Sequence, residues 1–265
     1  MGDRIDALSD VLFLARSAAR VRILRHLLES GPATQQEIRE ELSASRSTVT
    51  RTLAALAERE WVRTADGAYR LTPFGKVLTE NFLDLLDSFH LASDLAAFLV
   101  WFPYREFDLD VEQLREATIT RSTDGDPYAP ARRQTELFET TDRFRGFLPS
   151  IGLEGTKVVH EQITGDALEA EVIVSPSVES TIESGEFATL FREKLRTDRT
   201  TVLVAEDVPF YLGLADDRTV QIGVEDGEGF PRALVESRNP SVREWAESVY
   251  RRYRQRAREK PIAEF

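Results

Sequence analysis

One short polar face between residues 45 and 59 carries the side chains best suited to bind an anionic polymer. It presents two guanidiniums about one helical turn apart, with small hydroxyls between and beside them. Its members are Arg46, Ser47, Thr48, Thr50 and Arg51. Guanidinium forks match the edge of guanine or a phosphate, and hydroxyls approach phosphates and bases closely. This combination predicts contact with double-stranded DNA.

Two short helices joined by a tight turn are expected to position this face. Apolar residues repeat at helical spacing on the opposite side of each helix. They are Ile38 and Leu42 in the first helix, and Val49, Leu53 and Leu56 in the second. Ser45 suits the start of the second helix, because its hydroxyl can accept a backbone N–H. A helix after such a turn fits the major groove; the alternative is an ordinary helical hairpin with a solvated outer face.

The flanking segments predict a winged helix-turn-helix over residues 1–72. Helical spacing of apolar residues indicates two further helices, over residues 5–15 and 17–28. After the helical pair, strands at 61–63 and 69–71 are joined through Asp66-Gly67, which is a strong hairpin signal. Arg63 and Arg70 lie beside this turn, and we expect them to follow the DNA backbone or minor groove.

Residues 73–107 are expected to link this domain to the rest of the chain. A helix begins well at Thr72-Pro73 and would end at Pro103. Its apolar residues step alternately by four and three: Leu78, Phe82, Leu85, Phe89, Ala92, Ala96 and Leu99. Such a heptad seam predicts a homodimer with Phe82, Leu85, Phe89 and Ala92 at the interface. A helix that faces its own core would show a similar pattern.

Residues 108–265 predict a separate α/β domain for sensing or assembly, which makes the whole chain α+β. Strands are expected at 171–174, 201–205, 210–214, 220–224 and 233–235, and helices near 131–145, 156–163, 178–196 and 241–258. The segment 171–205 fits a parallel crossover, and the last three strands are close enough for a meander.

A small anionic effector is the ligand expected for this domain. Tyr128, Arg132, Arg133 and Arg145 surround the helix predicted after the Asp126–Pro130 turn. Guanidiniums beside a helix N-terminus can hold an anion. The alternative is that these arginines pair with neighbouring carboxylates.

Composition and charge restrict the class of protein. The chain has no cysteine, no apolar run of roughly 18 residues and no signal-peptide pattern, which predicts a soluble cytoplasmic protein without membrane contact. Its net charge is −12, yet residues 1–78 carry 12 basic and 10 acidic residues, so the acidity lies in the remainder. Only four of the 34 basic residues are lysine. This acidic, lysine-poor pattern is typical of salt-loving archaea, in whose cytoplasm distant charges are screened within ~3 Å at about 1 M salt.

Catalytic and metal-binding motifs are missing. The histidines are His26, His90 and His160, and none has lysine two residues on, as phospholipase D-like phosphodiesterases require. His160-Glu161 lacks the second histidine of a zinc helix. We therefore expect no catalytic residue, no metal site and no cofactor.

The motifs together resemble the archaeal winged-helix transcriptional regulators. The N-terminal blocks are residues 14–17 (LARS), 20–24 (RVRIL), 45–53 (SRSTVTRTL) and 69–75 (YRLTPFG). The later blocks 125–130 (GDPYAP), 145–149 (RGFLP), 209–213 (PFYLG) and 232–236 (RALVE) resemble the C-terminal domain first described as the middle part of a methanogenesis regulator. This resemblance implies promoter binding as a dimer and a sensor role for the C-terminal domain, but no ligand residues. The alternatives are a nonspecific architectural DNA-binding protein and a DNA-tethered phosphodiester or nucleotide enzyme.

Overall fold

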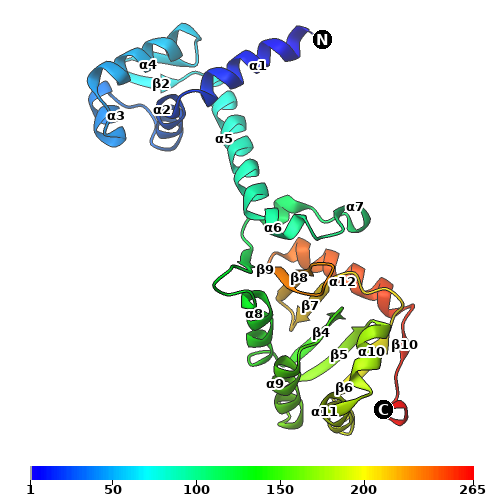
Figure 1. The fold of residues 1–265 in the computed structure, drawn as a ribbon. Helices are drawn as coiled ribbons and strands as arrows, with labels where there is room; N and C mark the ends of the chain where they lie inside the picture. Colours follow the sequence, from blue (N-terminus) through cyan, green and yellow to red (C-terminus); the bar gives the residue numbers. More distant parts are fainter. Residues whose placement is uncertain (1) are drawn as a thin grey trace. The chain divides into compact units, whose positions relative to one another are not determined.

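The computed structural model describes residues 2–265, with side chains from residue 7 onward, and divides the chain into compact units at 1–90 and 91–265 (Figure 1). The expected division into 1–72, 73–107 and 108–265 differs from this one. Helix α5 (Pro73–Asp94) begins in the first unit, where Leu78 and Phe82 pack on its core. The segment after residue 90 belongs to the second unit, because Leu91, Leu95 and Phe98 are buried there.

The first unit is a winged helix, as the sequence predicts. Its other elements are α1 (Gly2–Ala15), α2 (Ala18–Glu29), α3 (Gln35–Leu42), α4 (Arg46–Glu58), β1 (Val62–Ala65) and β2 (Ala68–Leu71). Ile38, Val49, Leu53, Leu56 and Trp61 are fully buried in one core with residues of α2. Burial of each such side chain contributes roughly 1.5–3 kcal/mol, so this core fixes how α3 and α4 cross.

Local capping and turn chemistry set the ends of these elements. Thr34 and Glu37 form a capping box at the start of α3, and the Ser45 hydroxyl accepts the Thr48 N–H at the start of α4. Ser43 ends α3 in the left-handed region. In the hairpin, Asp66 and Gly67 both have positive φ, which matches the type I′ turn that favours right-twisted strands.

The second unit is built on one eight-stranded mixed sheet in the order β10-β6-β5-β4-β7-β8-β9-β3. Strands β4, β5 and β6 are parallel, and β7, β8 and β9 form an antiparallel meander, which confirms the expected crossover and meander. The bounds are β3 (Thr118–Arg121), β4 (Arg143–Leu148), β5 (Glu169–Val174), β6 (Thr200–Val204), β7 (Tyr211–Ala215), β8 (Thr219–Glu225), β9 (Pro231–Ser237) and β10 (Arg258–Glu259).

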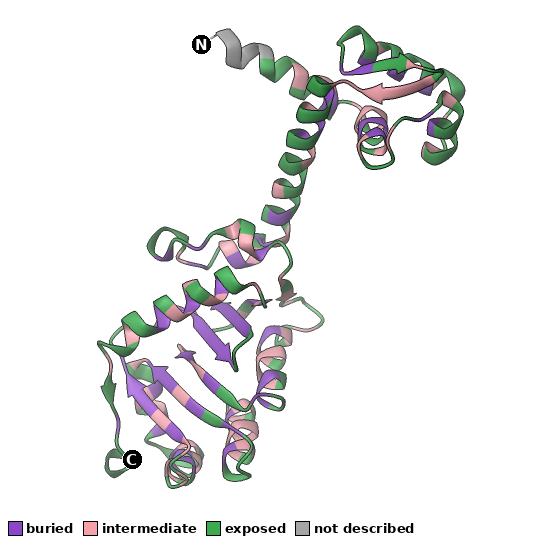
Figure 2. Ribbon diagram, turned by 180° about the vertical axis from the view of Figure 1, so that it is seen from behind, coloured by how far each residue is buried: buried purple, intermediate pink, exposed green. Residues whose placement is uncertain are grey.

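Helices cover both faces of this sheet, and the strands between them are largely buried (Figures 1 and 2). One face packs against α8 (Ala129–Phe138), α9 (Leu153–Thr164), α10 (Pro176–Ile182) and α11 (Gly185–Leu195). The other packs against α12 (Pro240–Arg254) and α6 (Ala96–Leu99). Neighbouring residues of β5 separate accordingly: Val172 and Val174 face the first helical layer, and Ile173 faces the second. The short helices α7 (Tyr104–Phe107), η1 (Val111–Leu114) and η2 (Ile262–Glu264) complete the unit.

Four expected elements were wrong in extent or type. The helix predicted over 131–145 ends at Phe138, and β4 follows it, so Arg145 lies on a strand. The helix over 178–196 is interrupted at residues 183–184, and α11 begins after them at Gly185, whose φ is +57°. The turn-rich composition of residues 118–130 predicts a connecting segment, but residues 118–121 of it form an edge strand. The linking helix stops at Asp94, because Leu95 and Phe98 turn into the core of the second unit.

Candidate nucleic-acid interface

The outer face of α4 presents the polar side chains that the sequence singles out. Arg46, Ser47, Thr50 and Arg51 are exposed, and Thr48 is half-buried. Val49 and Leu53, on the opposite side, are buried. The amphipathic spacing thus turns the two guanidiniums and the hydroxyls outward together.

The hydroxyls of this face are already held by the protein. Ser45 Oγ lies 3.0 Å from Ser47 Oγ and 2.8 Å from Thr48 Oγ1, within the cap of α4. Thr50 donates to the Arg46 carbonyl at 2.8 Å and accepts from Gln35 Nε2 at 2.5 Å. Gln35, the first residue of α3, was missed by the sequence reasoning. Gln35 and Thr50 are fifteen residues apart on different helices, so no helical periodicity indicates their contact. It depends on how α3 and α4 cross.

The two arginines of α4 differ from the hydroxyls. No described residue forms an ion pair or side-chain hydrogen bond with the guanidinium of Arg46 or Arg51. A guanidinium offers five donors in a planar fork. Both forks are therefore available to an external acceptor, while the surrounding hydroxyls keep a fixed geometry.

The hairpin adds a second cationic feature. Arg63 and Arg70 are cross-strand partners in the register of β1 and β2, and Arg63 is exposed. Arg70 pairs weakly with Asp66 at the hairpin tip, with 3.5 Å between Nη2 and Oδ2. The base of the wing is fixed to α5, since Thr72 Oγ1 donates to the Glu60 carbonyl and accepts the Gly75 N–H.

The residues expected at a dimer interface fall into two groups. Phe82 is only 7% exposed and belongs to the core of the first unit, so the alternative of a core-facing residue holds for this position. Leu85, Phe89 and Ala92 are exposed on α5. Phe74, Val77 and Leu86 are also exposed on this helix, although the heptad reading did not include them. These three residues do not share one stripe with Leu85, because Val77 and Leu86 lie on opposite sides of an α-helix with about 3.6 residues per turn.

The arginines expected to hold an effector are not brought together around one helix. Arg132 pairs with Asp126, and Arg133 pairs with Glu136 at 3.1 Å and Glu236 at 2.8 Å. Hydrogen bonds to these carboxylates raise the pKa of both arginines. Arg132 and Arg133 thus pair with neighbouring carboxylates, which is the alternative that the sequence left open.

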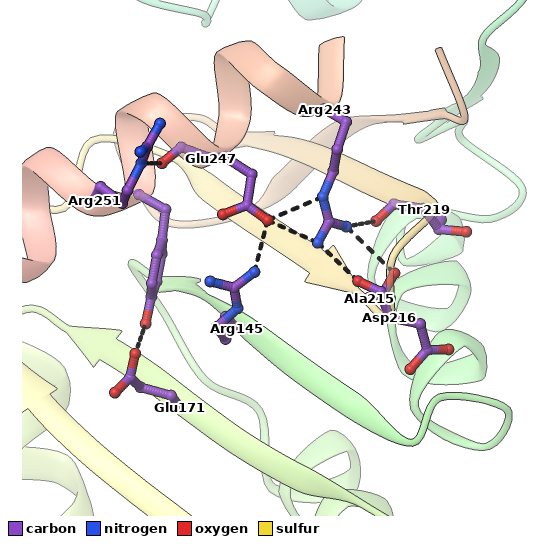
Figure 3. A network of polar contacts seen from close by, with 9 residues as sticks. Arg145, Glu171, Ala215, Asp216, Thr219, Arg243, Glu247 and Arg251 are labelled. Atoms are coloured by element: carbon purple, nitrogen blue, oxygen red, sulfur yellow. Dashed lines mark hydrogen bonds and ion pairs between the residues drawn. The ribbon is translucent and has the colours of Figure 1, made fainter. Parts of the chain in front are cut away.

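Arg145 belongs to a different network, which ties α12 to the sheet (Figure 3). Its Nη2 lies 2.6 Å from Glu247 Oε1, and the same oxygen accepts from Arg243 Nη2 at 2.9 Å. Arg243 also donates to the carbonyls of Asp216 and Thr219. Arg145 is thus part of a structural network on the far side of the domain from Tyr128, which lines a cavity under α8 and α9.

Among the described residues, no group of three or more histidine, aspartate or glutamate side chains could hold a metal ion. No helix in the described part of the chain is both long and apolar enough to cross a membrane.

Two domain families match the chain in succession. Residues 8–94 match the HVO_A0261 N-terminal domain. Residues 127–256 match the middle domain of the methanogenesis regulatory protein FilR1. The chain joins these two domains. This match confirms the resemblance to archaeal winged-helix regulators, and it assigns the second unit to a regulator-type domain.

Solved structures show more distant likenesses. TrmBL2, an archaeal chromatin protein, is 14% identical with a TM-score of 0.44, covering 98% of this chain and 100% of its own. The phospholipase D family member Nuc from Salmonella typhimurium is 10% identical with a TM-score of 0.42, covering 55% and 99%. NucT from Helicobacter pylori is 10% identical with a TM-score of 0.41, covering 54% and 98%. With TM-scores below 0.5, none of them supports a functional inference. No curated protein matches the sequence significantly.

Proposed function

We propose that the chain is a transcriptional regulator that binds a specific double-stranded DNA site as a homodimer. The exposed face of α4 carries this proposal. Arg46 and Arg51 offer unpaired guanidinium forks there, on the helix that a helix-turn-helix places in the major groove. The match to a regulator's middle domain supports the same function.

Each part of the first unit has a distinct role in this proposal. Arg46, in the first turn of α4, contacts a base edge, because recognition helices approach bases through their N-terminal residues. Thr50, held by Gln35, fixes how closely α4 approaches the groove. Arg63 and Arg70 bind phosphates and set the orientation of the wing.

The dimer forms along an exposed stripe of α5. Leu85 and Phe89 are exposed apolar residues one turn apart on this 22-residue helix. A second copy of the same helix would cover them in a self-complementary interface. Two copies of α4 would then read an inverted repeat with half-sites about one helical turn, ~34 Å, apart.

Sequencing of genomic fragments retained by the full-length protein, followed by footprinting, tests this function. The expected result is one discrete inverted repeat. Arg46→Ala and Arg51→Ala should each weaken operator binding by roughly 1–3 kcal/mol where the arginine contacts a base. Arg196→Ala is the matched control, since Arg196 is an exposed arginine of the second unit.

Three outcomes would contradict parts of the proposal. Uniform protection of all DNA would identify a nonspecific architectural protein. Equal loss on operator and random DNA would reassign the mutated arginine to a phosphate contact. Unchanged operator affinity in both variants would remove α4 from recognition.

A further inference from the structure

A partly open cavity of about 340 Å³ lies in the second unit between the sheet and helices α8, α9 and α11. Its walls are mainly apolar, with Phe138, Phe144, Val159 and Val172 among them. This volume lies at the lower end of the roughly 300–1,000 Å³ that small-molecule sites occupy. The cavity is therefore large enough for a compact ligand with an apolar body.

Lys194 is the unusual member of this wall. Its side chain is 3% exposed, and no described residue forms an ion pair or hydrogen bond with its Nζ. Nζ instead lies 3.5 Å from the centre of the Phe191 ring. Burial lowers the pKa of Lys194 to about 7. An ammonium group in an apolar wall without a counter-charge costs several kcal/mol of folding free energy.

Lys260 is a second buried lysine of the same unit, and unlike Lys194 it has carboxylate partners. It is 2% exposed, and its Nζ lies 2.6 Å from Glu183 and 3.1 Å from Glu179. Burial alone would lower the pKa of Lys260, but the hydrogen bonds to these two carboxylates raise it above its ordinary value. Lys194 is buried to the same degree and has neither partner. Of the two lysines that are buried in the described part of the chain, Lys194 in the cavity wall is thus the one without a counter-charge.

Two more polar groups of the wall help to define the ligand. Thr200 Oγ1 is buried without a hydrogen-bond partner and belongs to the same wall. Glu225 also lines the cavity, but it accepts a hydrogen bond from Ser150 and forms no ion pair with Lys194. Burial raises the pKa of Glu225. The cavity therefore offers one cation and one free hydroxyl to a ligand, while the Glu225 carboxyl is engaged by Ser150 in the same wall.

Two exposed aromatic residues give access to this space. Tyr128 is 55% exposed and Phe230 is 46% exposed, and both line the cavity. Phe230 belongs to the turn between β8 and β9, where its backbone N–H donates to Asp226. Aromatic rings at an opening favour entry of a ligand whose body is apolar.

We propose that this cavity binds a small monocarboxylate with an aryl or alkyl body. The carboxylate pairs with the Lys194 ammonium and accepts a hydrogen bond from Thr200, and the apolar body fills the space against Phe138, Phe144 and Val172. A charge-assisted hydrogen bond in a dry pocket is stronger than a neutral one.

Calorimetric titration of the full-length protein at pH 6.5 tests the proposal. The probes are 3-phenylpropionate and octanoate, and the matched neutral probes are 3-phenylpropan-1-ol and octan-1-ol. The wild type should bind each carboxylate about tenfold or more tightly than its alcohol. Lys194→Met keeps an unbranched apolar side chain in the wall and should remove this preference. Lys76→Met is the control, because Lys76 is exposed in the first unit.

Thr200→Val provides a second variant of nearly unchanged shape. It should weaken carboxylate binding about fivefold, so the preference over the alcohol becomes smaller but does not disappear. Equal affinity for acid and alcohol in the wild type, or a full preference in Lys194→Met, would overturn the proposal. Failure of all four probes to bind the wild type would overturn it too.

Discussion

Arg63 and Arg70 stand directly opposite each other across the hairpin of the wing, at paired positions of its register. Side chains at opposed positions extend from the same face of a two-stranded sheet, and like charges there are destabilising. Asp66 compensates only in part, since its contact with Arg70 is 3.5 Å long and exposed. An external anion between the two guanidiniums would remove this repulsion, and a DNA phosphate is the anion that the proposed function supplies.

Arg63→Ala should therefore weaken binding to every DNA sequence by a similar factor. Loss of one phosphate contact should also lower the salt dependence of the binding constant by about one unit of slope. Fluorescence anisotropy at several salt concentrations measures both quantities on operator and random duplexes. A loss confined to the operator would show that Arg63 reads a base, and an unchanged slope would place the wing away from DNA.

Leu85→Glu should convert the proposed dimer to a monomer. Leu85 is 41% exposed on α5, so the single chain tolerates the carboxylate, whereas an interface between two copies would bury it unpaired. Sedimentation equilibrium measures the mass, and circular dichroism checks that the monomer is folded. Leu8→Glu is the control, because Leu8 is similarly exposed on α1. A dimer that survives Leu85→Glu and dissociates with Leu8→Glu would place the interface on α1.

Gly75→Ala should destabilise the first unit. A Cβ at this position would lie 1.9 Å from the Trp61 carbonyl oxygen, so α5 would have to move away from the hairpin base. Overpacking of this kind costs about 1–3 kcal/mol. Thermal unfolding should show a lower transition temperature for this variant. Gly227→Ala is the control, since a Cβ there meets nothing within 4 Å and it should leave the transition unchanged.

Much of the winged helix could be predicted because local signals and tertiary structure agree there. The Ser45 cap, the periodicity of Val49, Leu53 and Leu56, and the Asp66-Gly67 turn each specify one boundary or one buried face. The exposed face of α4 follows from the same periodicity. The position of Gln35 beside Thr50 does not, since it depends on how two helices cross.

In the second unit the helix predicted over 131–145 overran the start of β4. Arg143 and Arg145 alternate with Phe144 and Gly146, which is the period of a strand, but the run is short and follows the end of α8 closely. The pairing of Arg133 with Glu236 joins residues about a hundred positions apart, so no local pattern indicates it. Phe82 was predicted at the dimer interface for another reason. A heptad repeat of apolar residues has the same pattern whether the helix packs on the core of its own chain or on a second copy of itself.

Lys194 could have been noticed from spacing alone. Ala188 and Phe191 precede it by six and three residues on α11, and both are buried, so the amphipathic pattern places Lys194 on the inner face. A lysine at such a position makes the free energy of unfolding depend on pH, whether or not a ligand is bound. Its pKa of about 7 in the folded chain lies well below the 10.5 of an ordinary lysine.

Between these two pKa values the unfolded chain binds a proton that the folded chain has released. Stability therefore rises with pH across this interval and is lost as pH falls through 7. The free energy of unfolding of the wild type should rise relative to Lys194→Met by up to about 1.4 kcal/mol per pH unit between pH 7 and 9.5. Urea unfolding of both proteins at four pH values measures this difference. The comparison isolates Lys194, because the two chains differ at this residue alone. A difference that stays constant with pH would show that Lys194 remains charged in the folded protein, with a counter-ion or water in the cavity.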